Sequence, residues 1–161
     1  MRRTDRAVED IDTLEAMLAA ARVCYLAFSG GDYPYVVPLH YGYIRAGDSF
    51  RLYMHCANAG DKLDRMRADP RVAFAVDCAY TIVPGEGACR YTTRYESVMG
   101  QGVLRETSGA DKHDGLMAIM RQVAPGKSHG IPRESLAGVT VLRLDVNLLT
   151  GKRNGGPVRE Q

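Results

Sequence analysis

A lysine at the start of a short predicted helix is the side chain of this sequence best placed for ligand chemistry. In YMHCANAGDKLDRMRADP a strand ends, a turn containing Ala59 and Gly60 follows, and Lys62 stands at the helix entry. The first turn of a helix has free backbone N–H groups and partial positive charge, so a lysine there can bind phosphate. A solvent-exposed lysine is the plainer alternative, and the neighbouring Asp61 weakens the attraction for an anion. These residues alone favour the plainer alternative.

Two predicted strands carry further candidates. In PYVVPLHYGY, Pro38 interrupts an apolar strand and lacks an N–H donor, which leaves neighbouring backbone groups free for a flat heterocycle. An edge strand with a protective proline explains the same residues equally well. In RYESVMGQG, strand alternation puts Tyr95, Ser97 and Met99 on one face, which meets either a ligand or a partner. A barrel strand packed on both sides is the alternative.

Histidines and cysteines give weaker signals. His40 and His55 lie in apolar strands, whereas His113 and His129 have polar surroundings typical of a surface. His55 and Cys56 are adjacent, and neighbours on a strand point to opposite faces, so we expect no metal site there. The cysteines form no C-x-x-C pair and lie in or beside apolar stretches, which predicts reduced core thiols at Cys24, Cys56, Cys78 and Cys89.

Several classes of protein are disfavoured. Gly85-Glu86-Gly87 lacks the third glycine and the βαβ unit of a dinucleotide fold, and there is no phosphate-binding loop or nucleophile elbow. A formal charge of +2 predicts no nucleic-acid partner, and no apolar run is long enough for a membrane span. We therefore expect a cytoplasmic protein of 161 residues folded as one domain, residues 1–161.

The expected elements are mainly strands. Apolar periodicity predicts helices near residues 7–21, 59–70 and 109–123, with a flexible stretch over 124–138. Strands are expected at 23–29, 33–44, 49–56, 71–79, 89–106 and 140–151, with a loop over 81–89 and a mobile polar tail at about 152–161. Strands joined by such short helices predict a closed or half-closed antiparallel barrel.

The ordered segments VCYLAFSGGDYPYVVPLHYGY, LYMHCANAGDKLDRMRADPRVAFAVD, RYESVMGQGVL and a last strand ending TGK resemble the pyridoxamine 5'-phosphate oxidase-like family, in particular its nitroimidazole-resistance reductase branch. The resemblance runs from about residue 3 to residue 153. It implies a mainly β fold with flanking helices, a six-stranded antiparallel split β-barrel, and a homodimer with two FMN molecules between the subunits.

The resemblance also implies site residues. The isoalloxazine ring would lie along Val36, Val37, Pro38, Leu39 and His40, mostly against their backbone. His55 and Cys56 would lie near the ribityl chain and ring, and Lys62 would hold the phosphate with Gly60 and Asp61. Ser97, with Tyr95 nearby, would come from the other subunit, and His55 is the first choice for a role at the substrate.

Two departures from the true oxidases are visible. Asp61 stands where they have an arginine, so Lys152 or Arg153 is a candidate to complete the phosphate site. KRNGGPVREQ lacks their arginine-bearing substrate motif, which disfavours pyridoxamine phosphate. We expect an FMN-dependent oxidoreductase with a small-molecule electron acceptor such as a nitroaromatic compound. A flavin- or haem-binding protein without turnover is the alternative, with His40, His55 or a tail residue as axial ligand, and a deazaflavin protein ranks third.

Overall fold

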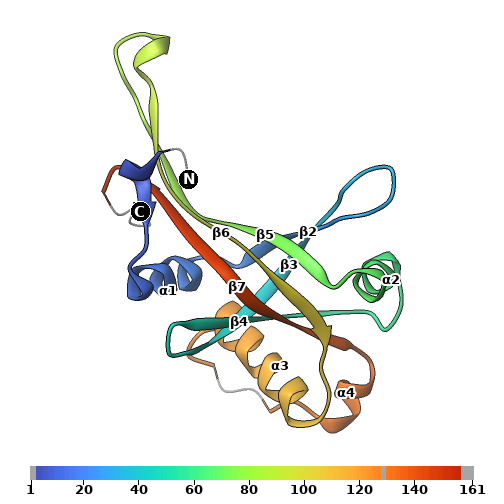
Figure 1. Ribbon diagram of the computed structural model, residues 1–161. Coiled ribbons are helices and arrows are strands. Elements are labelled where there is room, and N and C mark those ends of the chain that lie inside the picture. The colour runs from blue at the N-terminus through green and yellow to red at the C-terminus, as the bar shows by residue number, and fades with distance from the viewer. Residues whose placement is uncertain (1–2, 128–129, 157–161) are drawn as a thin grey trace.

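The computed structural model describes residues 3–127 and 130–156, and its centre is a six-stranded antiparallel barrel (Figure 1). The strand order β7-β4-β3-β2-β5-β6 closes because β6 also pairs with β7. These strands are β2 (Val23–Phe28), β3 (Tyr35–Ala46), β4 (Ser49–Cys56), β5 (Arg71–Val83), β6 (Thr92–Glu106) and β7 (Thr140–Asn154). The predicted six-stranded barrel is confirmed. A two-residue strand, β1 (Ala7–Val8), adds to the outer edge of β7.

Helices lie around the barrel. Helix α1 (Ile11–Ala20) places Leu14, Met17 and Leu18 in the core shared by all six barrel strands. The side chain of Asp10 accepts a hydrogen bond from the Thr13 amide at 2.8 Å and so caps the helix start. Because residues 7–8 are held as β1, the predicted start near residue 7 is four residues early.

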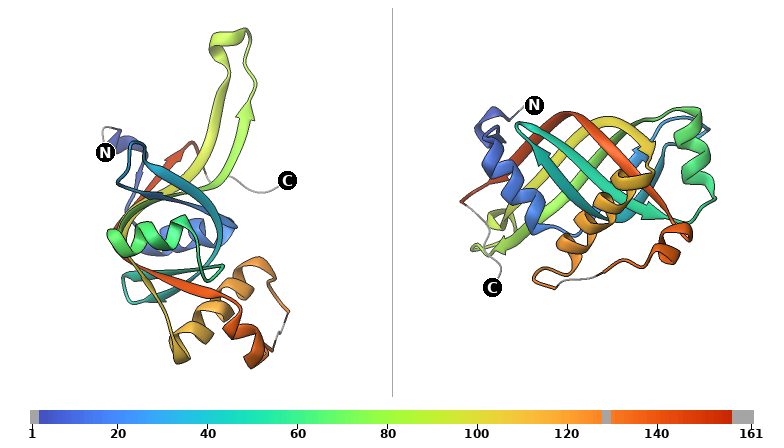
Figure 2. Two further views of the ribbon diagram at one scale, coloured as in Figure 1. Left: turned by 90° about the vertical axis from the view of Figure 1, so that its right-hand side faces the viewer. Right: turned by 90° about the horizontal axis from the view of Figure 1, so that it is seen from below.

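A second small core forms where α3 (Gly109–Val123) packs outside β3 and β4 (Figure 2). Its bounds agree with the prediction. Gly42 of β3 allows this packing, because a Cβ there would collide with the Ala118 backbone of α3. Helix α2 (Asp61–Ala68) connects β4 to β5, and a short helix, α4 (Arg133–Ala137), lies in the stretch predicted to be flexible. None of the described helices is long and apolar enough to cross a membrane.

Strands β5 and β6 continue beyond the barrel as a two-stranded arm (Figures 1 and 2). Their pairing runs out to Val83 and Thr92, and a short 3-10 turn, Ala88–Arg90, lies near the tip. The predicted loop over 81–89 is therefore partly strand. Cys89 is exposed at this tip, which corrects the expectation of a core thiol there, whereas Cys24 is buried.

The end of β7 corrects another boundary. Lys152, Arg153 and Asn154 pair with β6 rather than starting a mobile tail. Residues 157–161 of the predicted tail lie outside the described residues.

Candidate functional site

Strand β3 changes its partner halfway along its length, and this change opens the barrel. Tyr35–His40 pair with β2, whereas the pairing with β4 starts only at Tyr41 and runs to Ala46. Backbone N–H and C=O groups alternate between the two edges of a strand. No described strand therefore pairs with the edge of residues 35–40 that faces β4. Half of the backbone groups of these residues point to that edge and are available to a ligand.

Lys62 lies beside this opening. It lines a pocket of about 170 Å³ together with Tyr35, Cys56 and the turn through Gly60. Gly60 precedes the helix with φ of 130°, a conformation that side chains disfavour, and no side chain caps α2. The Leu63 amide donates to the Gly60 carbonyl, whereas the amides of Asp61 and Lys62 before it remain available to an anion.

The neighbouring acids do not neutralise Lys62. Asp61 binds the Arg65 guanidinium, with Nε 3.0 Å from Oδ2, and Asp64 lies 3.7 Å from Arg67. Arg65 also donates to the Gly30 carbonyl and stacks over the Tyr35 ring at 5.0 Å. Because Asp61 is paired with Arg65, it repels a bound anion less strongly. Arg65 was missed from the sequence, although the four-residue spacing from Asp61 is the spacing typical of a helical ion pair.

The positive charge of Lys62 also acts on the Cys56 thiol. Burial raises the pKa of the Cys56 thiol, the Lys62 ammonium opposes that rise, and Glu106 adds to it. Its side chain packs on the barrel core, while the side chain of His55 is exposed on the other face of β4. The prediction that His55 and Cys56 point to opposite faces of their strand is confirmed.

The five candidate residues on β3 also alternate between the core and the exposed face of their strand. Val37 and Leu39 pack on the core, so only their backbone can reach a ligand outside the barrel. Val36, Pro38 and His40 are exposed on the opposite face. The Nδ1 atom of His40 lies 3.1 Å from the Arg22 carbonyl, to which it donates when protonated, and Nε2 is then the acceptor of the ring.

These exposed β3 residues belong to a wide, largely apolar surface. Paired residues in antiparallel strands share a face, and the registers give two rows across β3, β2, β5, β6 and β7. We call their surface the outer face; its rows are Val36, Ala27, Ala73, Gln101, Leu148 and Pro38, Tyr25, Ala75, Met99, Thr150. The exposed fractions of Val36, Leu148, Tyr25 and Met99 are 56%, 50%, 45% and 41%.

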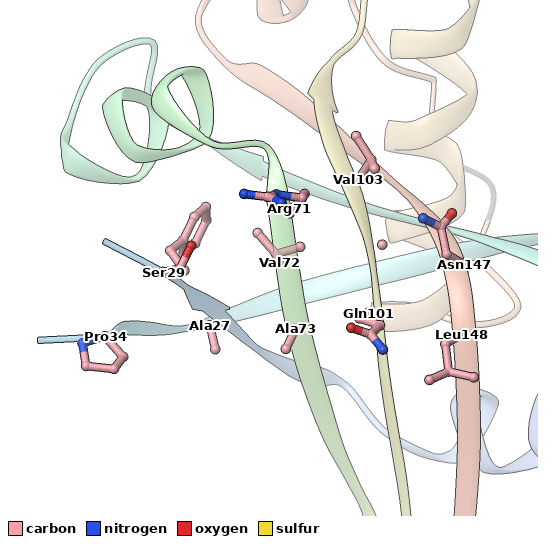
Figure 3. Close-up of a pocket in the computed structure, with 12 residues that line it drawn as sticks. Ala27, Ser29, Pro34, Arg71, Val72, Ala73, Gln101, Val103, Asn147 and Leu148 are labelled. Atoms are coloured by element: carbon pink, nitrogen blue, oxygen red, sulfur yellow. The ribbon is translucent and has the colours of Figure 1, made fainter. Parts of the chain in front are cut away.

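A shallow groove of about 570 Å³ crosses the outer face. Figure 3 shows Ala27, Ala73, Gln101 and Leu148 side by side on four strands, with Pro34 beyond Ala27 and Arg71 farther along the strand of Ala73. Such an exposed apolar area on a small protein is typical of an interaction site.

Tyr95 and Ser97 continue the outer face at the base of the arm. Ser97 pairs with Asp77 on one side and Lys152 on the other, and Tyr95 pairs with Tyr80 and Asn154. On the outer face they are separated from His40 and Pro38 by β2 and β5. One chain therefore does not bring all of the predicted residues together.

The two candidates for completing the phosphate site, Lys152 and Arg153, lie near the end of β7. Arg153 is already bound to the buried Glu96, with Nε 2.7 Å from Oε1. Lys152 lies over the Tyr95 ring, 5.7 Å from its centroid. Neither lines the Lys62 pocket.

Comparisons with known proteins agree with this fold. The structure of a protein described as a putative 5-nitroimidazole antibiotic resistance protein, from Bacteroides thetaiotaomicron, is 25% identical, with a TM-score of 0.78 over 91% of this chain and 86% of that chain. The flavocytochrome Anf3 from Azotobacter vinelandii is 21% identical, with a TM-score of 0.78 over 100% and 75% of the two chains. An FAD and heme binding protein from Mycobacterium smegmatis is 19% identical, with a TM-score of 0.79 over 97% and 77%.

A search of curated proteins gave no match. The model of one protein family, described as pyridoxamine 5'-phosphate oxidase, matches residues 10–153. That match covers all six strands of the barrel, the Lys62 pocket and both halves of β3. The chain belongs to the pyridoxamine 5'-phosphate oxidase family.

Proposed function

We propose that this protein is an FMN-dependent oxidoreductase that acts as a cytoplasmic homodimer. The observation that carries the proposal is Lys62, a lysine at an uncapped helix start beside the open edge of β3, in a helix whose acids are paired with arginines. A bound flavin would supply electron transfer, while the protein would bind it and orient the acceptor.

The residues fit the cofactor in two parts. The Lys62 ammonium and the first-turn amides of α2 would hold the phosphate through charge-assisted hydrogen bonds. The free backbone edge of Tyr35–His40 would meet the polar rim of the ring system, with Pro38 contributing an apolar surface. Ser97 and Tyr95 would reach the ring from a second copy, because they lie on the outer face away from β3.

The acceptor we propose is a nitroaromatic compound. The support is the 25% identical Bacteroides structure, described as a putative 5-nitroimidazole antibiotic resistance protein. His55 is exposed next to the opening, so an imidazole nitrogen could give a proton to the reduced acceptor or orient it. Replacing His55 with Gln would separate these roles, because glutamine can orient the acceptor but cannot give a proton.

The visible spectrum tests the proposal. Purified protein is mixed with excess FMN, passed through gel filtration and examined for bound chromophore. A two-banded flavin spectrum at one FMN per chain is expected. After the bound flavin is reduced without air by a stoichiometric amount of dithionite, adding a nitroimidazole should restore the oxidised bands. Loss of all flavin during filtration would contradict the proposal.

A haem-binding protein is the second candidate, and the His40 geometry favours it. A hydrogen bond from one ring nitrogen to a carbonyl orients the other toward a metal, as in many histidine ligands. Two of the similar structures are a flavocytochrome and an FAD and heme binding protein, which also supports this candidate. Adding haemin instead of FMN would then give a Soret band that His40→Ala abolishes.

A further inference from the structure

Arg65 lies one turn along α2 from Asp61 and connects two residues that line the Lys62 pocket. Its Nε donates to Asp61 Oδ2 at 3.0 Å, and its Nη1 donates to the Gly30 carbonyl at 3.0 Å. The same guanidinium lies over the Tyr35 ring, 5.0 Å from the centroid. Asp61 and Tyr35 both line the pocket, whereas Arg65 does not. One side chain outside the lining therefore holds two residues of it.

The ion pair sets the charge next to Lys62. Over residues 3–127 and 130–156, Arg65 is the only cation within ion-pair distance of Asp61. Without Arg65, the Asp61 carboxylate would carry an uncompensated negative charge beside the phosphate that the pocket is proposed to bind. Like charges at short range repel each other, so this carboxylate would subtract from the attraction of the Lys62 ammonium.

The other two contacts of Arg65 hold the turn before β3 against α2. Gly30 and Gly31 form this turn with φ of 89° and 75°, a conformation that other residues disfavour. The turn brings the Gly30 carbonyl to the Arg65 guanidinium. Tyr35 begins β3 after the turn, and its ring also packs beside the buried ring of Phe28, with the centroids 5.7 Å apart. Arg65 thereby fixes the Tyr35 wall of the pocket relative to the helix that carries Lys62.

We propose that Arg65 is a positioning residue of the phosphate site, which neutralises Asp61 and holds Tyr35 without touching the cofactor. This inference rests on the proposed flavin function and adds to it a residue that favours flavins with a phosphate group. FMN binding should depend on Arg65, whereas the binding of riboflavin, which lacks the phosphate, should not.

Fluorescence titrations of the flavin-free protein with FMN and with riboflavin test the proposal. Arg65→Gln should weaken FMN binding about fivefold, because it leaves Asp61 without a cation at a partly exposed site, and should leave riboflavin binding unchanged. Adding Asp61→Asn to Arg65→Gln removes the uncompensated carboxylate and should recover most of the FMN affinity. Arg65→Lys should retain part of that affinity, since lysine keeps the charge but lacks the planar donor fork.

Arg67→Gln is the matched control. It removes the same charge from the same helix, at a residue that binds Glu106 and does not line the pocket. This variant should bind both flavins like the wild-type protein.

Equal losses of FMN and riboflavin affinity in Arg65→Gln would overturn the proposal, because Arg65 would then act on the fold as a whole. An unchanged FMN affinity would also overturn it, as would a loss that Asp61→Asn leaves equally large. Lys62→Gln separates these failures from a failure of the flavin function. If the wild-type protein binds FMN and Lys62→Gln weakens that binding, only the role of Arg65 is wrong. If the wild-type protein binds no FMN, the proposed function itself fails.

Discussion

Lys62 is the residue on which the flavin proposal depends most directly. Lys62→Gln should weaken FMN binding by at least about tenfold, because a charge-assisted hydrogen bond contributes roughly 1.5–3 kcal/mol. Quenching of FMN fluorescence measures the affinity. Lys127→Gln is the matched control, since it removes the same charge from an exposed position outside the pocket. Equal affinities of the two variants would remove Lys62 from the site.

The reactivity of the Cys56 thiol tests the effect of the Lys62 charge without any flavin. Because the Lys62 ammonium opposes the burial that raises the pKa of the Cys56 thiol, Lys62→Gln should raise that pKa further. At a given pH below it, less thiolate is present and alkylation should be slower. The pH profile of iodoacetamide labelling measures this in a Cys89→Ser background, which removes the exposed thiol at the arm tip. Faster labelling after the substitution would show that Lys62 does not act on Cys56.

Among the elements, α3 and β3 pack closely at Gly42. Gly42→Ala should lower the free energy of unfolding by about 1–3 kcal/mol, because the added methyl group collides with the Ala118 backbone of α3. Urea unfolding measures the change. Gly130→Ala is the control, since a Cβ there meets no atom within 4 Å and the residue is not in the left-handed region. An unchanged midpoint for Gly42→Ala would mean that α3 shifts at little cost.

The elements also show where prediction from sequence succeeds and where it stops. Periodicity and turn residues located α3 and the barrel strands, because each pattern is local. The exchange of partners between His40 and Tyr41 depends on strands distant in the chain, so no local pattern shows it. The family resemblance, rather than the residues themselves, named Lys62 and the β3 backbone. The arm had a local signal, since Tyr80 and Ile82 alternate like strand residues beyond the predicted end of β5.

At the scale of the whole molecule, the proposed homodimer would explain the outer face and the arm. Beyond Asn154, no strand pairs with the free side of the arm among the described residues, and Tyr80 and Ile82 are 67% and 60% exposed. A two-stranded ribbon is only marginally stable alone in water. A second copy packed face to face would cover the same surface on both chains, as a two-fold interface requires. It would also bring Ser97 of the partner subunit toward β3.

Ala73→Glu tests this arrangement, because Ala73 is exposed in a row at the middle of the outer face. A buried charge without a partner costs several kcal/mol, so the variant should be a monomer in light scattering at concentrations where we expect the wild-type protein to be a dimer. Ala110→Glu changes another exposed alanine, in the first turn of α3, and should remain a dimer. If the flavin site is shared, FMN affinity falls together with dimerisation in Ala73→Glu only. A monomeric variant that binds FMN as tightly as the wild-type protein would confine the site to Lys62 and β3 of one chain.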